Sequence, residues 1–254
     1  SEGRLHETPY WHILLHYKKK LFGTESLVDD PDFFLSPLGR TDPRAELAAN
    51  IRGLFQAERK GEPHPICRFP ARYAWLRQEL DIDGTRLPLT ECQPFEEMVA
   101  DLRAESASVA FPTYHMNSPA SMFGHTLINV ETRDFTSHLL SHTVNYAADA
   151  TDTNGFLFAF KGLFGFYKGF YSILPYYQKI QEYSDIAQRD IWEYQLSLTP
   201  AEVRRMVAHI WEFRDIHTDY YFFDENCSYN LLFLLEAARP SLRLTERFPL
   251  WVTP

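Results

Sequence analysis

Apolar positions along the chain recur with helical spacing in some segments and alternate in others, and this mixture predicts an α+β fold. The strongest pattern lies in residues 220–238, YYFFDENCSYNLLFLLEAA. The run Asp224-Glu225-Asn226 offers N-cap candidates, and the segment after Cys227 is apolar on nearly every face. A helix that is apolar all round is buried, so a core helix is predicted to begin at Cys227, with the rest of the chain organised around it.

Helical spacing predicts four further helices, over residues 8–20, 43–60, 71–80 and 199–215. The buried stripe of the second is predicted to consist of Leu47, Ile51, Leu54 and Phe55. The last opens on a capping sequence, with Thr199 as N-cap, Pro200 at the first helical position and Glu202 at the third. The first hundred residues are therefore expected to be mainly helical.

Alternating and β-branched sequence predicts strands over residues 106–114, 122–130, 139–147 and 188–197. The second and third are expected to pair as a hairpin. Residues 155–177 are rich in phenylalanine and glycine and allow two interpretations. They form either buried strands with bulges, or an apolar groove or flexible lid for an acyl chain.

Composition narrows the class of protein. The chain has 254 residues, enough for one large domain, and 45% of them are hydrophobic. Its net charge of −9 disfavours a nucleic acid or an anionic membrane surface as partner. No window of the sequence is long and apolar enough to read as a membrane span.

The chain has three cysteines, an odd number. Cys67 and Cys92 both flank proline-rich, irregular sequence, where a disulfide would contribute about 3 kcal/mol of stability. Cys227 would then remain as a free thiol, and this combination suits an oxidising compartment. The alternative is three reduced, buried cysteines in a cytosolic protein.

Cys227 is the candidate nucleophile, because the first turn of a helix has unpaired N–H groups and a dipole that favour a thiolate. The alternative is a small buried apolar residue. A thiolate needs a base, and His125 is the best candidate, since Gly124 precedes it, a turn-rich loop leads into it and a strand carries it. The alternative for His125 is a histidine that is only hydrogen bonded in place.

No metal or other cofactor is expected. His12 and His16 have the i, i+4 spacing of helical metal ligands, but no third ligand lies near them in sequence. His138 and His142, at the start of the strand predicted over 139–147, are also four residues apart, but an extended chain places them about 13 Å from each other, which is too far for one metal. The turn that begins at Asp81 lacks the later ligands of a calcium loop.

Several long phrases occur in the order of a known family: CRFPARYAWL, NSPASMFGHTLINV, HTVNYAADA, KGLFGFYKGFYSILPYY, RDIWEYQLSLTPAE and FFDENCSYNLLFLLEAARP. They resemble the N-terminal periplasmic domain of Lnb-type lipoprotein N-acyltransferases. The order of a strand histidine before a helix-borne cysteine is also similar to that of circularly permuted NlpC/P60-like thiol enzymes. Within that papain-like group, the pair Asn226-Cys227 resembles the nucleophile motif of lecithin:retinol acyltransferase relatives.

The resemblance implies that Cys227 is the nucleophile and His125 its base. Asn145 is the favoured third member because an amide fixes a histidine tautomer without adding charge, with His142 as the alternative. The register of the hairpin decides which of the two faces His125. The oxyanion is expected to meet the backbone N–H of Cys227 and the loop 117–121.

The predicted fold is thus α+β, with an antiparallel sheet carrying His125 packed against the helix that begins at Cys227. Residues 1–254 are expected to form a single domain, with a helical, disulfide-pinned part over 1–100 and a thiol-enzyme core over 101–254. The function that the resemblance implies is acyl transfer through a Cys thioester to an amine of a lipoprotein in the periplasm. The alternatives are a cysteine peptidase or amidase that uses the same dyad, and a non-catalytic binding domain. The expected partner is a lipid or lipoprotein, with membrane proximity through the substrate or through terminal segments outside the chain.

Overall fold

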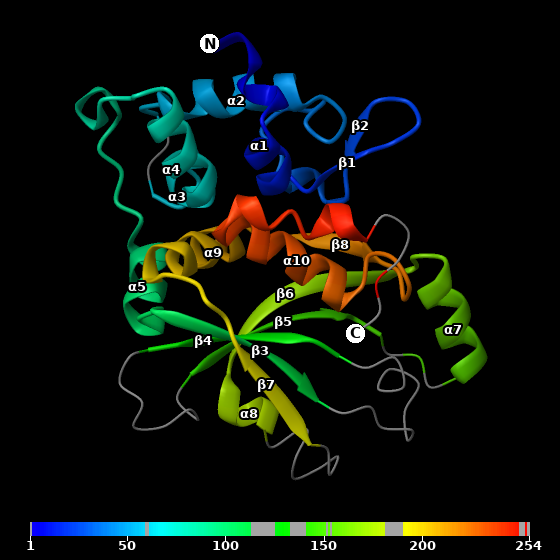
Figure 1. Ribbon diagram of the computed structural model, residues 1–254. Helices are drawn as coiled ribbons and strands as arrows, with labels where there is room; N and C mark the ends of the chain where they lie inside the picture. The colour runs from blue at the N-terminus through cyan, green and yellow to red at the C-terminus, as the bar shows by residue number, and fades with distance from the viewer. Residues whose placement is uncertain are drawn as a thin grey trace.

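The computed structural model describes residues 2–58, 61–112, 125–132, 141–150, 152, 154–180, 190–248 and 252. The described residues form a six-stranded antiparallel sheet in the order β7-β3-β4-β5-β6-β8. Its strands are β3 (Ser106–Pro112), β4 (Leu127–Glu131), β5 (His142–Ala148), β6 (Tyr167–Pro175), β7 (Ile191–Gln195) and β8 (His217–Tyr220). Helices α9 (Pro200–Glu212) and α10 (Cys227–Ala238) lie across one face of this sheet (Figure 1). The fold is α+β, as the sequence predicts.

The two helices on the sheet begin where local sequence places them. Thr199 and Glu202 form a reciprocal capping box at α9, and the side chain of Asn226 accepts a hydrogen bond from the backbone of Tyr229 at α10. Both helices bury apolar side chains against the middle strands. This core includes Ile128, Val144, Met206, Ile210, Leu231 and Leu234.

The N-terminal part contains α1 (Pro9–Leu14), a hairpin of β1 (Tyr17–Lys19) and β2 (Thr24–Ser26), α2 (Pro43–Leu54), α3 (Pro65–Arg68), α4 (Pro70–Glu79) and α5 (Gln93–Leu102). The prediction of one helix over 8–20 is wrong at its C-terminal end. The backbone of His16 is left-handed, with φ 51°, and the chain turns there into β1. The second predicted helix ends at Leu54 instead of residue 60, and Phe55 is exposed. The predicted helix over 71–80 is confirmed by α4.

Residues 155–177 contain both a helix and a strand. The prediction of strand structure is wrong for α7 (Gly155–Leu163), because the Asn154 side chain caps the backbone N–H groups of Phe156 and Leu157. Gly165, with φ 72°, follows the helix, and β6 takes up the rest of the stretch. Among the large apolar side chains of α7, Phe158 alone is buried, so the buried-strand interpretation fails for this helix.

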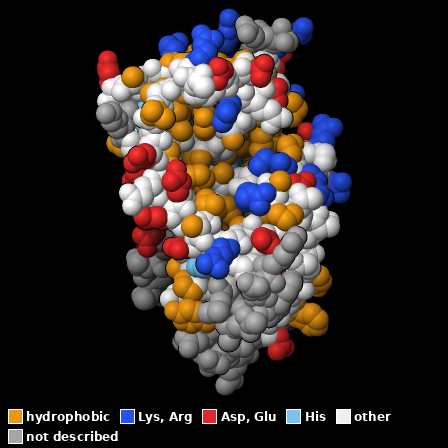
Figure 2. Space-filling model, turned by 90° about the vertical axis from the view of Figure 1, so that its left-hand side faces the viewer, with side chains coloured by type: hydrophobic (Ala, Val, Ile, Leu, Met, Phe, Trp, Pro, Cys, Tyr) orange, Lys and Arg blue, Asp and Glu red, His pale blue; other side chains and the backbone are white. Residues whose placement is uncertain are grey.

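The remaining short elements connect these layers. The helix α8 (Tyr176–Ile180) follows β6, and the 3-10 turns are η1 (Glu2–Glu7), η2 (Pro31–Phe33), η3 (Gly84–Arg86), η6 (Pro240–Leu242) and η7 (Thr245–Arg247). Helices α1, α2, α3 and α4 sit above α9 and α10, on the side away from the sheet (Figure 1). Seen from the left of that view, apolar side chains gather across the middle of the molecule (Figure 2).

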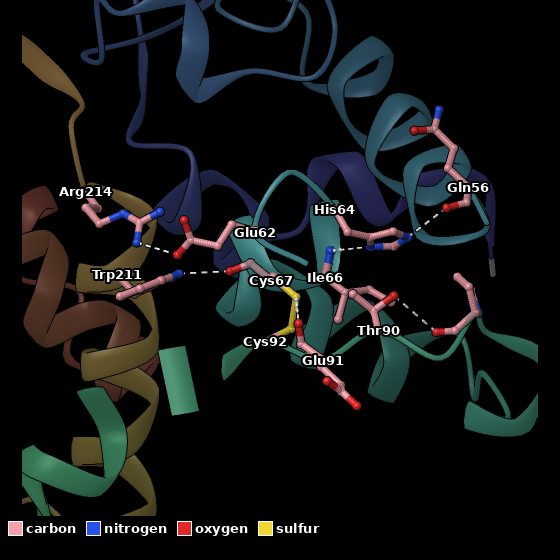
Figure 3. Close-up of a disulfide and its surroundings, with 11 residues drawn as sticks. Gln56, Glu62, His64, Ile66, Cys67, Thr90, Glu91, Cys92, Trp211 and Arg214 are labelled. Atoms are coloured by element: carbon pink, nitrogen blue, oxygen red, sulfur yellow. Dashed lines mark hydrogen bonds and ion pairs between the residues drawn. A yellow bond between two sulfur atoms is a disulfide. The ribbon is translucent and has the colours of Figure 1, made fainter. Parts of the chain in front are cut away.

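A disulfide joins Cys67 in α3 to Cys92, the residue before α5, as the sequence predicts (Figure 3). The third cysteine, Cys227, is free and buried. The Trp211 indole of α9 donates a hydrogen bond to the Cys67 carbonyl at 2.8 Å, so the bridged segment is also held to α9. Closing this loop contributes about 3 kcal/mol by the loop-entropy estimate.

Buried polar side chains join the N-terminal part to α9. Glu212 accepts a hydrogen bond from the backbone N–H of Arg72 at 2.9 Å, and its other oxygen lies 3.0 Å from Nδ1 of His209. Nε2 of His209 lies 3.2 Å from Nε2 of His16. Burial, followed by the charges of His209 and Arg72, holds the pKa of His16 well below its usual range. His16 is therefore neutral at physiological pH. Arg72 and Glu212 form a buried ion pair between the N-terminal part and α9, and we call this set of buried polar contacts the seam.

Candidate active site

Cys227 opens α10 with its side chain only 1% exposed. The preceding Asn226 fixes the turn that leads into the helix. Its amide nitrogen donates to the carbonyl oxygens of Phe222, at 3.0 Å, and Val252, while its oxygen caps the helix. The thiol is therefore held at the helix N-terminus, where the dipole and unpaired N–H groups stabilise negative charge.

His125 lies two residues before β4, and its partner comes from the neighbouring strand. Nε2 of His125 is 2.6 Å from Oδ1 of Asn145 in β5. His142 of the same strand instead pairs in the ladder with Val130 and Pro175. Of the two candidates for this contact, Asn145 is thus the residue that the hairpin register brings to His125.

A neighbouring strand fixes the tautomer of His125. The amide nitrogen of Asn145 donates to Oγ of Ser172, at 3.2 Å, and Ser172 lies opposite Asn145 in the β5–β6 pairing. Oδ1 of Asn145 is consequently the acceptor for His125, so Nε2 of His125 carries a proton. This leaves Nδ1 as the ring nitrogen for the contact with the thiol of Cys227.

The surroundings of Cys227 act on its pKa in opposite directions. Burial, the largest influence, raises the pKa, but the charge of His125 and a hydrogen bond from its ring lower it. Hydrogen bonds from the backbone N–H of Thr126 and from the Tyr220 hydroxyl lower it further. The net effect is a thiol whose pKa lies below its usual range.

Tyr220 is a site residue that the sequence analysis missed. It ends β8, and its hydroxyl oxygen accepts the backbone N–H of Cys227 at 3.4 Å while also contacting the thiol. Burial, followed by the charge of Cys227, raises the pKa of Tyr220 well above its usual range, so this hydroxyl stays protonated. The ring stacks on Tyr146, with centroids 5.6 Å apart. No local pattern distinguishes Tyr220 from the other aromatic residues of the segment.

Thr126 and Ser228 are two further residues without a sequence signal. Their hydroxyl oxygens lie 2.6 Å apart, which joins the start of β4 to the first turn of α10. Because Thr126 follows His125 and Ser228 follows Cys227, this hydrogen bond fixes the distance between the two candidate residues. The loop 117–121, expected to help bind an oxyanion, and Gly124 lie outside the described residues.

Glu225, two residues before Cys227, has a pKa raised to about 8. Burial is the main cause, and the charges of Asp224 and Asp29 act in the same direction, against Lys20 and Lys18. In the unfolded chain the Glu225 carboxyl has the ordinary glutamate pKa of about 4.3. Between about pH 4.3 and 8 the folded state therefore holds a proton on Glu225 that the unfolded state has lost. The stability that this proton gives is lost as the pH rises through 8.

Replacing Glu225 by glutamine is therefore expected to leave stability at about pH 4 nearly unchanged and to raise it at about pH 9, on the order of 1–2 kcal/mol for this partly exposed group. Urea unfolding at the two pH values measures the difference. The same substitution at the exposed Glu91 serves as the control and should leave the pH dependence unchanged. Equal effects of the Glu225 substitution at both pH values would contradict the protonated state.

The described ranges contain no group of three or more His, Cys, Asp or Glu side chains that could hold a metal ion. His12 contacts the carbonyl of His6 and His16 contacts His209, so the two histidines with i, i+4 spacing face different partners. Among the helices that the structure describes, none is long and apolar enough to cross a membrane.

The chain matches two family models. The first, described as the Lnb N-terminal periplasmic domain, matches residues 94–253, more than half of the chain. The second, described as a domain of unknown function (DUF7843), matches residues 3–79. No curated protein and no solved structure matches the chain. His125, Asn145 and Cys227 all lie within the first match, and the buried seam at Arg72 and Glu212 joins it to the second.

Proposed function

Because this chain belongs to the family of Lnb N-terminal periplasmic domains, we propose that it is an acyltransferase that passes an acyl group through a thioester on Cys227 to an amine. The family gives the chain a periplasmic location and the context of lipoprotein modification. The amine in this proposal is the N-terminus of a lipoprotein, and the acyl donor is a lipid ester.

The single observation that carries the proposal is the position of His125 between Asn145 and Cys227. A thiol attacks an ester only as the thiolate, and its pKa here is lowered in spite of burial. Asn145 holds the imidazole in one tautomer without introducing a charge that would compete for the proton. The same three residue types in a purely structural setting would have no reason to stabilise a buried thiolate.

The reaction proceeds in two balanced halves. The Cys227 thiolate attacks the ester carbonyl, and the alkoxide leaving group takes the proton of the His125 imidazolium as the C–O bond breaks. The acceptor amine then attacks the thioester and gives its proton to His125 as the C–S bond breaks, which restores the thiolate–imidazolium pair. The sum of the two halves is an ester plus an amine giving an amide plus an alcohol.

Tyr220 is the residue we assign to the oxyanion. Its protonated hydroxyl and the backbone N–H of Cys227 lie together beside the thiol, 3.4 Å from each other. A carbonyl oxygen placed there by attack of the thiolate would accept hydrogen bonds from both groups. The buried setting strengthens such bonds.

We also infer that the core has the permuted NlpC/P60-like arrangement, since a histidine at the start of a sheet strand precedes a cysteine at the head of a packed helix. We further infer that residues 1–254 act as one domain. The fully buried pair of Arg72 and Glu212 supports this inference. Separating the N-terminal part from α9 would expose both charges to water or leave them buried without a partner.

The proposal is tested by the mass of the intact protein after incubation with a phospholipid that has no amine in its headgroup and, separately, with a diacylated lipopeptide whose N-terminal amine is acetylated, so that no amine acceptor is present. We expect a mass increase of one acyl chain on Cys227, removable by hydroxylamine as a thioester is. The Cys67–Cys92 disulfide leaves Cys227 as the one free thiol of the chain, so the site of the adduct is unambiguous. Tyr220→Phe is expected to slow adduct formation by about 100-fold.

Adding an amine-bearing lipopeptide then separates transfer from hydrolysis. An acylated amine as product supports the acyltransferase, whereas release of free fatty acid alone identifies a hydrolase with the same dyad. The absence of any adduct on wild-type protein, with either donor, would contradict the proposal and favour a non-catalytic binding domain.

A further inference from the structure

The hairpin of β1 and β2 exposes two large apolar side chains at its tip. The backbone N–H of Lys20 donates to the carbonyl of Gly23 at 3.1 Å and closes the turn, with Gly23 at φ 91°. Leu21 and Phe22 lie in this turn and are 97% and 98% exposed. Scattered apolar residues are common on surfaces, but two adjacent ones on a projecting turn make no packing contribution to this fold.

Helix α7 presents a second exposed apolar surface. Phe158 anchors the helix, packing on Phe222 and Tyr167 with centroids 4.9 and 5.7 Å away. The remaining large apolar side chains of the helix and the turn after it are exposed, namely Phe156, Leu157, Phe160, Leu163, Phe164 and Phe166. Lys161, the one charged residue of the sequence 155–166, is paired with Asp152 at 2.8 Å.

Both surfaces are attached to the segment that leads into Cys227. Lys18 of β1 lies 3.6 Å from Asp224 and stacks over the ring of Tyr229 in α10. On the other side, the backbone N–H of Phe222 donates to the carbonyl of Gly162 in α7 at 3.0 Å. In Figure 1 the hairpin and α7 project toward the same side, above and below the loop that precedes α10. We call this side, comprising Leu21, Phe22 and the exposed apolar residues of 156–166, the docking face.

We propose that the docking face binds the surface of a lipid bilayer, with the hairpin tip and α7 inserted at the boundary between headgroups and acyl chains. Two separate convex apolar projections fit a fluid surface that accommodates any shape, whereas a protein partner would need two matching pockets. Phenylalanine and leucine on such projections are typical of helices and loops that lie in the membrane interface.

Local charge favours the same partner. Lys19 and Lys20, beside the hairpin tip, are exposed and make no ion pair with any residue that the structure describes. The net charge of −9 disfavours an anionic surface when it is considered for the whole chain. At the docking face, however, the unpaired charges next to the apolar tip are positive and can reach anionic headgroups within a Debye length. Figure 2 shows the opposite side of the molecule, where the apolar side chains are bordered by acidic side chains along one edge and by basic side chains along the other.

Docking in this orientation would bring the N-terminal end of α10 toward the lipid. Under the proposed function, the acyl donor would then reach Cys227 from the bilayer without crossing water. This consequence rests on the proposed function, but the docking itself does not, because it requires no reaction. Binding can therefore be measured on Cys227→Ser protein, which cannot form a thioester.

The test is flotation of the full chain with vesicles of phosphatidylethanolamine containing about a quarter phosphatidylglycerol. We expect wild type and Cys227→Ser to bind equally, and the paired substitutions Leu21→Asp with Phe22→Asp, and Phe164→Asp with Phe166→Asp, each to lower the partition coefficient about tenfold or more. The matched control is Leu89→Asp, since Leu89 is 101% exposed but stands in the disulfide loop, away from the docking face. All five positions are exposed, so unchanged thermal unfolding should verify that the variants fold.

Several results would overturn the proposal. They are a wild type that does not float, paired variants that float like wild type, a loss confined to one of the two projections, or an equal loss in Leu89→Asp, which would indicate unspecific adsorption. A wild type that forms dimers in light scattering, and paired variants that do not, would assign the face to a second copy instead. Vesicle binding without any acyl adduct would support the docking face and contradict the proposed function. An acyl adduct without vesicle binding would support the proposed function and contradict the docking face.

Discussion

Replacing His125 by alanine is expected to lower acyl-transfer turnover by about 1,000-fold or more, because the thiolate loses its positive partner and the amine its base. Cys227→Ser should fold but show no turnover, since the two side chains are close in size. Asn145→Ala should retain more activity than His125→Ala, because the imidazole is still present and only its orientation is lost. The matched control is His142→Ala, on the same strand as Asn145, which should stay close to wild type.

The pKa of Cys227 gives an independent measurement of the same pair. Iodoacetamide labelling of the wild type should have its midpoint below the free-thiol value of about 8.5. In His125→Ala the midpoint should rise part of the way back, because the charge of His125 is lost while the helix N-terminus and the hydrogen bonds from Thr126 and Tyr220 remain. The midpoint is the relevant quantity, since a thiol that is 1% exposed reacts slowly at any pH. An unchanged midpoint in His125→Ala, together with unchanged turnover, would exclude the dyad.

Replacing Glu212 by glutamine is expected to destabilise the protein by about 3 kcal/mol, because it leaves the buried Arg72 guanidinium without one of its two carboxylates. Glu46 still faces Arg72 at 3.4 Å, which keeps the expected loss at the lower end of values for broken buried pairs. The rings of Phe33 and Phe69, 4.1 and 4.0 Å from the guanidinium, cannot neutralise the charge. Urea unfolding measures the loss.

Glu62→Gln is the control for this substitution. Glu62 pairs with Arg214 of the same region at 2.7 Å, but both side chains are partly exposed, so the expected loss is about 1 kcal/mol or less. Similar losses for the two variants would mean that the seam between the N-terminal part and α9 does not depend on its buried charges. Two separate unfolding transitions in Glu212→Gln, against one in wild type, would show that the pair couples the two parts.

Features that depend on neighbours within three or four residues could be predicted from the sequence. Asn226 caps α10 through the backbone of Tyr229, and Thr199 and Glu202 cap α9 through each other. These hydrogen bonds are local, so residue type and spacing are enough to place the helix that carries Cys227. Local spacing misled the prediction for residues 155–163, where alternating phenylalanines suggested a strand. There the Asn154 cap starts a helix, and exposure of its apolar face removes the burial that a strand would have needed.

Residue types and their spacing were thus enough to predict the α+β class, the helix start at Cys227 and the pairing of Cys67 with Cys92, which leaves the Cys227 thiol free. The three-dimensional structure was needed to show that Asn145 faces His125, since strand pairing sets the register and a shift of one residue exchanges the two faces. It also decided that Tyr220 reaches the backbone of Cys227 and that Leu21 stands on a projecting turn. Such contacts join segments through packing and long-range pairing, which no local spacing encodes.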